Sequence, residues 1–119
     1  MSVEGNIVTT LRTIAPAHPL VAPEGSALPR FVFQQVGGQA VSFMDRALPK
    51  LQNGRFQIAA WAQTSVEASQ LALAAETALR VATLFQATPL GAPVAVLDED
   101  TGLHGRLQDF SIWSDRPAT

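Results

Sequence analysis

The stretch that decides the fold is residues 54–85, GRFQIAAWAQTSVEASQLALAAETALRVATLF. Its first part, residues 55–62, predicts a β-strand, because side chains alternate between the two faces of a strand and the residue types here alternate with them. One face of the predicted strand carries Phe56, Ile58 and Ala60. The opposite face carries Arg55, Gln57, Ala59 and Trp61.

A helix over residues 65–85 is predicted directly after this strand. Thr64 is a suitable N-cap, and Glu67 stands three residues later, which is the spacing of a capping box. Glu76 and Arg80 are four residues apart and can pair on the solvent side. The stripe predicted to face the core is rich in alanine and consists of Leu71, Ala75, Ala78, Leu79 and Ala82. Small side chains let the helix axis lie close to a sheet, and the obvious sheet is the one formed by the preceding and later strands.

The composition is that of one ordinary globular domain. The chain has 119 residues, 15% of them charged, a formal net charge of -2 and no cysteine. This excludes a disulfide framework, a zinc–thiolate site and a global basic field for nucleic acid. No apolar run reaches the roughly 20 residues of a membrane span, and the N-terminus lacks the features of a signal peptide. We therefore expect a soluble protein made in the cytoplasm, with residues 1–119 forming a single domain.

The first half of the chain predicts one short helix and two or three strands. The helix covers residues 3–14 and ends before Pro16. Residues 20–22 could form a short edge strand, and residues 30–36 predict a strand, with residues 39–43 as its hairpin partner. A charged connection over residues 44–53 ends in the turn signal Asn53-Gly54.

The second half predicts two further strands, over residues 94–97 and 105–113, joined by an acidic turn at residues 98–102. Helices and strands do not alternate strictly, so a doubly wound parallel fold is disfavoured. The predicted class is α+β. In it, an antiparallel sheet carries one long helix across one face, together with a short N-terminal helix.

No pattern in the sequence indicates catalysis, a cofactor or a metal. His18 and His104 lack partners at metal-ligand spacing, and the acidic run lacks the ligand pattern of a calcium loop. Gly37-Gly38 is not followed by a phosphate-binding helix pattern, and no serine has a GxSxG setting. Phe31 and Phe33 could stack nucleic-acid bases, but core packing is the better interpretation without flanking basic residues.

Two questions about the sheet stay open at this point. Cations gather near predicted strand ends and in the middle connection: Arg30, Arg46, Lys50, Arg55 and Arg106. They form either a solvated rim or a surface that meets a partner subunit or phosphate. Trp61 lies either on an open face that can dock a partner or beneath the N-terminal helix, and Trp113 ends the last predicted strand.

Three segments in combination carry a resemblance to a known family. They are the strand PRFVFQQV (residues 29–36), the strand RFQIAAWA with its following SVEA helix start (residues 55–68), and the closing strand LQDFSIW (residues 107–113). Together they resemble the minor tail proteins of long-tailed phages and prophages, a group that includes tail-completion, tail-terminator and head–tail joining proteins. The similarity runs from about Ile7 to Trp113.

The resemblance implies an α+β protomer without catalytic residues that forms a ring, commonly of six, at the head-proximal end of the tail. There it would cap the tail tube and contact the head connector, as part of the virion tail made in the bacterial host cytoplasm. It implies a tail-tube protein and a head-connector protein as partners. DNA contact through the lumen is compatible with it but not indicated. The candidate interface residues are Arg46, Lys50, Arg55, Trp61 and Trp113.

Two other classes of function compete with this one. The chain could be a small α+β binding or adaptor domain for a protein or peptide, which requires a concave pocket with convergent polar groups. A small enzyme would need a titratable group with a strongly shifted pKa in a cleft. A ring, by contrast, needs a heterologous interface that closes on itself, and a monomer in dilute solution is compatible with a ring that forms only on the growing tail.

Overall fold

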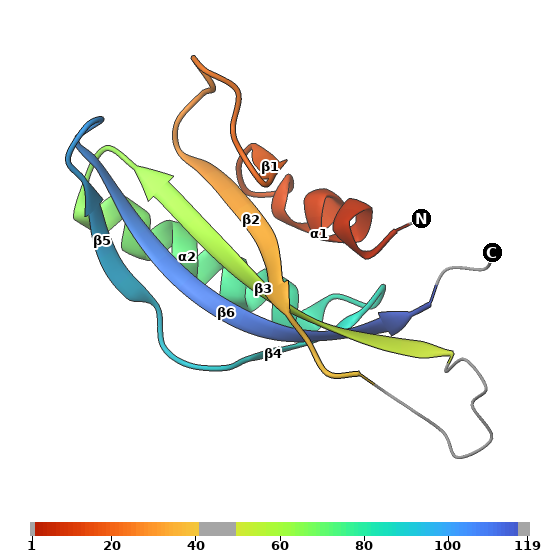
Figure 1. Ribbon diagram of the computed structural model, residues 1–119. Coiled ribbons are helices and arrows are strands. Elements are labelled where there is room, and N and C mark those ends of the chain that lie inside the picture. The colour runs from red at the N-terminus through yellow and green to blue at the C-terminus, as the bar shows by residue number, and fades with distance from the viewer. Residues whose placement is uncertain (1, 41–49, 117–119) are drawn as a thin grey trace.

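The computed structural model describes residues 2–40 and 50–116, which form one sheet with two helices packed on it (Figure 1). In chain order the elements are α1 (Val3–Leu11), β1 (Ala17–Pro19), β2 (Arg30–Gly37), β3 (Leu51–Ala62), α2 (Ser65–Val81), β4 (Gln86–Pro89), β5 (Val94–Asp98) and β6 (Leu103–Asp115). The molecule measures 52 by 26 by 25 Å, and the long strands β3 and β6 run along its length.

The sheet has six strands in the order β1-β2-β3-β6-β4, with β5 also paired to β6. Four strand pairs are antiparallel, namely β2–β3, β3–β6, β6–β4 and β6–β5. Strand β1 runs parallel to β2. The ladder between β3 and β6 is the longest. It runs without interruption from the pair Leu51 and Asp115 to the pair Ala62 and His104. The predicted α+β class is confirmed, with the correction that the sheet is mixed at one edge.

The core lies between the helices and one face of the sheet. Four phenylalanines fill it from the strands, namely Phe31, Phe33, Phe56 and Phe110. Ile7 and Leu11 of α1 join the same cluster as Leu71 and Leu79 of α2, so both helices cover the same face. The core interpretation of Phe31 and Phe33 is confirmed, because both are almost fully buried.

Helix α2 sits close to the sheet because alanines line its buried side. The predicted core positions Leu71, Ala75 and Leu79 are buried, whereas Ala78 and Ala82 are only partly buried. Ala68 and Ala72 complete the buried stripe instead. The N-cap is confirmed, since Thr64 Oγ1 accepts a hydrogen bond from the Glu67 N–H at 3.2 Å. The helix ends at Val81, four residues earlier than predicted.

Several predicted boundaries are wrong, and pairing with a distant strand explains the largest error. The turn predicted at Asn53-Gly54 lies inside β3, because Asn53 pairs with Trp113 and Gly54 with Ile112. Residues 39 and 40 are not in a strand, and residues 41–49, with the rest of the predicted hairpin partner and most of the charged connection, lie outside the described residues.

The N-terminal region is also shifted from the prediction. Helix α1 ends at Leu11, one turn before the predicted end. The edge strand predicted at residues 20–22 is formed by Ala17–Pro19, after which Leu20 adopts a positive φ of 68° and turns the chain away from the sheet. Strand β4 was not predicted, whereas β5 and β6 are confirmed with small extensions.

The acidic turn between β5 and β6 has the predicted form. Gly102 closes it by donating its N–H to the Asp98 carbonyl oxygen at 2.7 Å, with a φ of +72° that favours glycine. The Asp98 carboxylate accepts the Asp100 N–H at 3.1 Å within the same turn. Neither described helix is long and apolar enough to cross a membrane.

Removing a core side chain from α2 should destabilise the fold far more than removing an exposed one. Leu79 is fully buried, so we expect Leu79→Ala to lower the free energy of unfolding by about 2–5 kcal/mol. Leu73 lies on the solvent side of the same helix, and Leu73→Ala should change it by less than about 0.5 kcal/mol. Urea unfolding followed by circular dichroism measures both, and equal losses would contradict the assigned core.

A hydrogen bond between the sheet and α2 should make stability depend on pH. The Gln108 amide donates to Glu76 Oε1 at 2.7 Å and, with Arg80, keeps the pKa of Glu76 below its usual value of 4.5, although burial opposes this shift. A carboxylate with a lowered folded-state pKa stabilises the protein above its unfolded pKa. That contribution disappears as the pH falls through the folded pKa.

We therefore expect Glu76→Gln to be less stable than the wild type at pH 7, and the difference to shrink as the pH is lowered below about 4.5. The effect should be small, because the Glu76 side chain is a quarter exposed and solvent screens it. Unfolding free energies across this pH range measure it. Glu24→Gln, in an exposed loop, is the control for the effect on stability of losing one negative charge. A stability difference for Glu76→Gln that does not change with pH would contradict the lowered pKa assigned to Glu76.

Candidate functional site

The face of the sheet opposite the helices is uncovered in the part of the chain that the structure describes (Figure 1). Because α1 packs beside α2, the interpretation that α1 covers Trp61 is wrong, and Trp61 lies on this open face. The strand register arranges the open face in cross-strand rows. From one end of the face to the other, the rows are Arg30–Trp61–Gly105–Val96, His18–Val32–Ala59–Leu107–Val94, Gln34–Gln57–Asp109, Arg55–Ser111–Thr88 and Asn53–Trp113–Gln86.

The first two rows make one end of the open face largely apolar. Trp61 is half-buried because its ring lies over Gly105, where a Cβ atom would come within 2.7 Å of Trp61 Cζ3 and 2.9 Å of Val96 Cγ2. Glycine at this position therefore leaves the space that the indole occupies. Val32, Ala59 and Leu107 continue the apolar surface toward the middle of the sheet.

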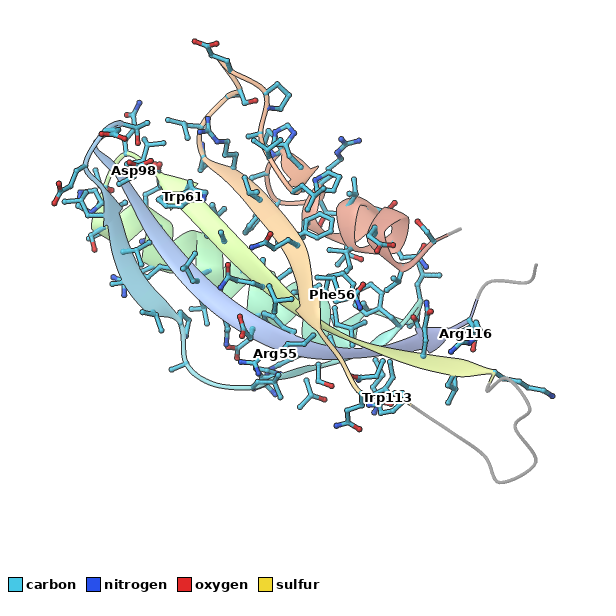
Figure 2. The ribbon with its side chains drawn as sticks, in the orientation of Figure 1. Arg55, Phe56, Trp61, Asp98, Trp113 and Arg116 are labelled. Carbon is cyan, nitrogen blue, oxygen red and sulfur yellow. The ribbon has the colours of Figure 1, made fainter. Side chains whose placement is uncertain are left out.

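The remaining rows are polar and are tied together across β3 and β6. Arg55, which is labelled in Figure 2, donates from Nη2 at 2.7 Å and from Nε at 2.9 Å to one oxygen, Asp109 Oδ2, and these two bonds hold the pair together. Asn53 Nδ2 donates to Ser111 Oγ at 2.9 Å. The Arg55 side chain is about half exposed, so this ion pair stabilises the fold by at most about 1 kcal/mol and still presents charge to solvent.

Two shallow hollows meet on this face at Arg55 and Leu90. One, of about 310 Å³, lies between the loop before β5 and the central strands, and is lined by Gln57, Val94, Leu107 and Asp109 among others. The other, of about 300 Å³, lies toward the end of β2 and includes Gly38, Asn53 and Ser111. We refer to these two adjoining hollows together as the groove.

The structure brings three of the five predicted interface residues onto the open face. Trp61 and Trp113 lie toward its two ends, and Arg55 lies between them. Trp113 is eight residues along β6 from Gly105, the partner of Trp61, which corresponds to about 26 Å at about 3.3 Å per residue. Lys50 lies elsewhere, at the end of the β3–β6 ladder, where its carbonyl accepts the Arg116 N–H at 2.7 Å. Arg46 lies outside the described residues.

The predicted cations do not form one surface. Arg30 shares the open face with Arg55, and its Nη1 donates to the Ser26 carbonyl oxygen at 3.0 Å. Arg106 belongs to the helix side, where its Nη2 donates to Ser65 Oγ at 3.1 Å near the start of α2. The described cations therefore lie on more than one surface of the molecule, and a contact of any of them with a partner subunit or phosphate stays a prediction.

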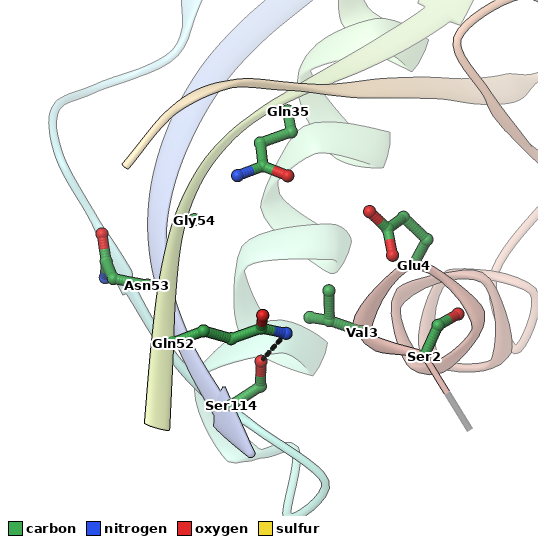
Figure 3. A pocket seen from close by; sticks show the side chains of 8 residues that line it. All are labelled: Ser2, Val3, Glu4, Gln35, Gln52, Asn53, Gly54 and Ser114. Atoms are coloured by element: carbon green, nitrogen blue, oxygen red, sulfur yellow. Dashed lines mark hydrogen bonds between the residues drawn. The ribbon is translucent and has the colours of Figure 1, made fainter. Parts of the chain in front are cut away.

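A third hollow, of about 200 Å³, lies on the helix side between the first turn of α1 and the ends of β3 and β6 (Figure 3). Gln52 Nε2 donates to Ser114 Oγ at 3.4 Å within it, and Glu4 is its single ionisable side chain. A pair of groups for acid–base chemistry is thus missing from its lining. Within residues 2–40 and 50–116, no three His, Cys, Asp or Glu side chains gather as metal ligands would.

Comparison with protein families gives one match, to the family described as Tail completion protein gp17, over residues 8–115. The chain belongs to this family. The matched region begins within α1 and ends at the last residue of β6, so it includes the whole sheet and α2. Comparison with curated proteins finds no match. The resemblance to phage tail-completion proteins drawn from three sequence segments is confirmed.

Several residues of the open face were not indicated as site residues by any pattern in the sequence of this tail completion protein. Asp109 carries the partner charge of Arg55 but is separated from it by 54 positions, so no local pattern links them. Leu90 and Val94 line the groove, and the strand predicted over residues 94–97 gave no indication that its side chains are exposed. Their exposure follows from the place of β5 at the sheet edge, which only the fold reveals.

A side chain added at Gly105 should displace Trp61 and disturb the apolar end of the open face. We expect Gly105→Ala to lower the free energy of unfolding by about 1–3 kcal/mol and to shift Trp61 fluorescence to longer wavelength, because the indole must move toward water. Gly91→Ala is the matched control, since its added methyl group meets no atom within 4 Å. An unchanged emission spectrum in the Gly105 variant would contradict the packing of Trp61 on this glycine. A Trp113→Phe background isolates the Trp61 signal.

Proposed function

We propose that this tail completion protein is a non-enzymatic assembly protein that forms a ring of about six copies at the head-proximal end of a phage or prophage tail. In this role the ring terminates the tail tube and joins it to the head connector. The observation that carries the proposal is the family match over residues 8–115, which spans nearly every element of the fold.

The distribution of exposed apolar side chains supports an assembly role. A two-layer fold leaves an entire sheet face uncovered, and here that face combines the half-buried Trp61 with a solvated ion pair, Arg55–Asp109. Aromatic and arginine side chains are the residue types that most often anchor protein interfaces. The two hollows beside Arg55 are shallow, which suits the surface of a protein partner better than a small molecule.

The alternative, an adaptor domain for a peptide, draws on the same groove. Its two hollows, of about 310 and 300 Å³, are at the lower limit of the size of ligand pockets, and polar groups such as Gln57 and Asp109 converge on one of them. This alternative predicts a monomer that binds a peptide without self-association, so the oligomeric state separates the two proposals.

The proposed function predicts both a closed ring and an effect on tube growth. We expect native mass spectrometry to show a species of about 76 kDa, six copies of the 12.7 kDa chain, alone or in the presence of the cognate tube protein. Added to a polymerising tube protein, the chain should stop elongation, and electron microscopy should show shorter tubes capped at one end. Tubes that elongate equally with and without the chain would refute the terminating role.

A variant of the open face tests whether this surface contributes to tube binding. Arg55→Ala should weaken capping while changing the free energy of unfolding by less than about 1 kcal/mol, because the pair it breaks is solvent-exposed. Arg80→Ala is the control, since it breaks the comparably exposed pair with Glu76 on the helix side of the molecule. Equal effects of the two variants on capping would indicate that the tube-binding surface does not lie on the open face.

A further inference from the structure

The sheet ends in two unpaired backbone edges on opposite sides of the molecule. Strand β5 pairs with β6 on one side, and nothing in residues 2–40 or 50–116 pairs with its other side. At the opposite border, β1 covers only the part of β2 from Phe31 to Phe33, so residues 34–37 have no partner away from β3 in the described chain. Each edge therefore presents backbone N–H and C=O groups to which another strand can hydrogen-bond.

The β5 edge lacks the features that usually protect a free strand. It contains no lysine, arginine or proline, and Val94 and Leu97 are 61% and 57% exposed. Free edges are normally blocked by charged side chains, prolines or bulges, because an open apolar edge invites another strand. Asp98 at the end of β5 is its one charged residue, so the unprotected part is the four apolar residues Val94–Leu97. This apolar edge indicates a strand as its partner.

The opposite border is also uncharged, although two of its four residues are glutamines and a bulge interrupts its pairing with β3 between Gln35 and Gly37. Residues 34–37 are Gln-Gln-Val-Gly, and beside them Leu20 and Val21 are exposed by 72% and 74%. The Leu20 N–H donates to the Phe33 carbonyl oxygen at 2.8 Å, which holds this segment against the end of the β1-covered part of β2. Leu20 does so at a φ of 68°, an unfavourable conformation for leucine, and its side chain still points to solvent.

The directions of the strands fit these two edges together. Strand β2 is antiparallel to β3, β3 to β6 and β6 to β5, so β2 and β5 run in opposite directions within one copy. The register places β5 level with residues 30–32 of β2, and residues 34–37 level with β4. When a second copy lies beside the first in the same orientation and is displaced along the strands, β5 of one copy therefore meets residues 34–37 of β2 in the next as an antiparallel neighbour. The antiparallel alternation of the sheet then continues from one copy into the other.

We infer that copies of this chain join through their sheet edges, with β5 (Val94–Asp98) of one copy pairing antiparallel with residues 34–37 of β2 in the next, beside Leu20 and Val21. The contact is heterologous, because two different edges meet, and this is the kind of interface that a ring requires. The inference rests on the proposed function, since it specifies the surfaces through which the proposed ring closes.

Charged substitutions on each edge test the pairing. One variant combines Val94→Lys with Leu97→Lys on the β5 edge, and a second combines Val21→Lys with Val36→Lys at the β2 edge. The control combines Val66→Lys with Leu73→Lys on the outer side of α2, because these residues match the first pair in type and exposure. Circular dichroism and thermal unfolding establish that all three remain folded.

Native mass spectrometry should show the wild type and the α2 control as rings and each edge variant alone as a monomer. An equimolar mixture of the two edge variants should give a species of two copies and nothing larger, because each variant keeps one intact edge. Hydrogen exchange on the wild type gives an independent measurement, with slower exchange expected for the amides of Val94–Asp98 in the assembled state than in the monomer.

Three results would overturn the edge pairing: rings that persist in both edge variants, a mixture that stays monomeric, or a wild type that stays monomeric both alone and with the cognate tube protein. Loss of the ring in the α2 control to the same extent would also overturn it. The proposed function is judged separately by the capping of tubes. A chain that caps tubes through rings insensitive to these lysines keeps its function and loses only this interface.

Discussion

The close packing of α2 against β3 and β6 is the contact on which the rest of the structure depends. Ala68, Ala72 and Ala75 face the sheet, and their small side chains let the helix lie near the large ones of Phe56 and Phe110. Helix α1 fills the space beside α2 on the same face, so the core is complete with two layers. Within residues 2–40 and 50–116 both helices pack on this one face, and the open surface on the other is a direct consequence of where they pack.

The elements that sequence patterns predicted well are those whose signals are local. The strand at residues 55–62 alternates between the two faces, and Thr64 ends it with a helix cap that depends on its immediate neighbours. Boundaries failed where pairing across the sheet overrides local preference. Asn53-Gly54 is typical of a turn, yet both residues are held extended because β6 provides partners for them. Strand β4 is short and contains Pro89, and it exists because β6 extends beyond β5.

The candidate site was predictable to the extent that it follows from the alternation of one strand. The alternation along β3 correctly separated Arg55 and Trp61 from the core residues Phe56 and Ile58. It could not reveal that Asp109 holds Arg55, or that Arg106 belongs to the helix side, because both facts depend on the register between β3 and β6. Nor could the hydrophobic run at β5 show that its side chains are exposed, since buried and edge strands share the same pattern.

The polar and apolar features of the surface suit different parts of an assembly role. Backbone pairing along an edge is strong but nearly independent of side chains, so it can join identical copies without requiring charged residues there. Recognition of a different protein needs side chains that discriminate, and these lie on the open face, where Arg55 and Asp109 hold each other in a fixed geometry beside an aromatic surface. Because the edges and the open face point in different directions, contacts between copies through the edges leave that face free. Each copy in a closed ring would then present the same open face, and the ring would meet a tube with many equivalent weak contacts acting together.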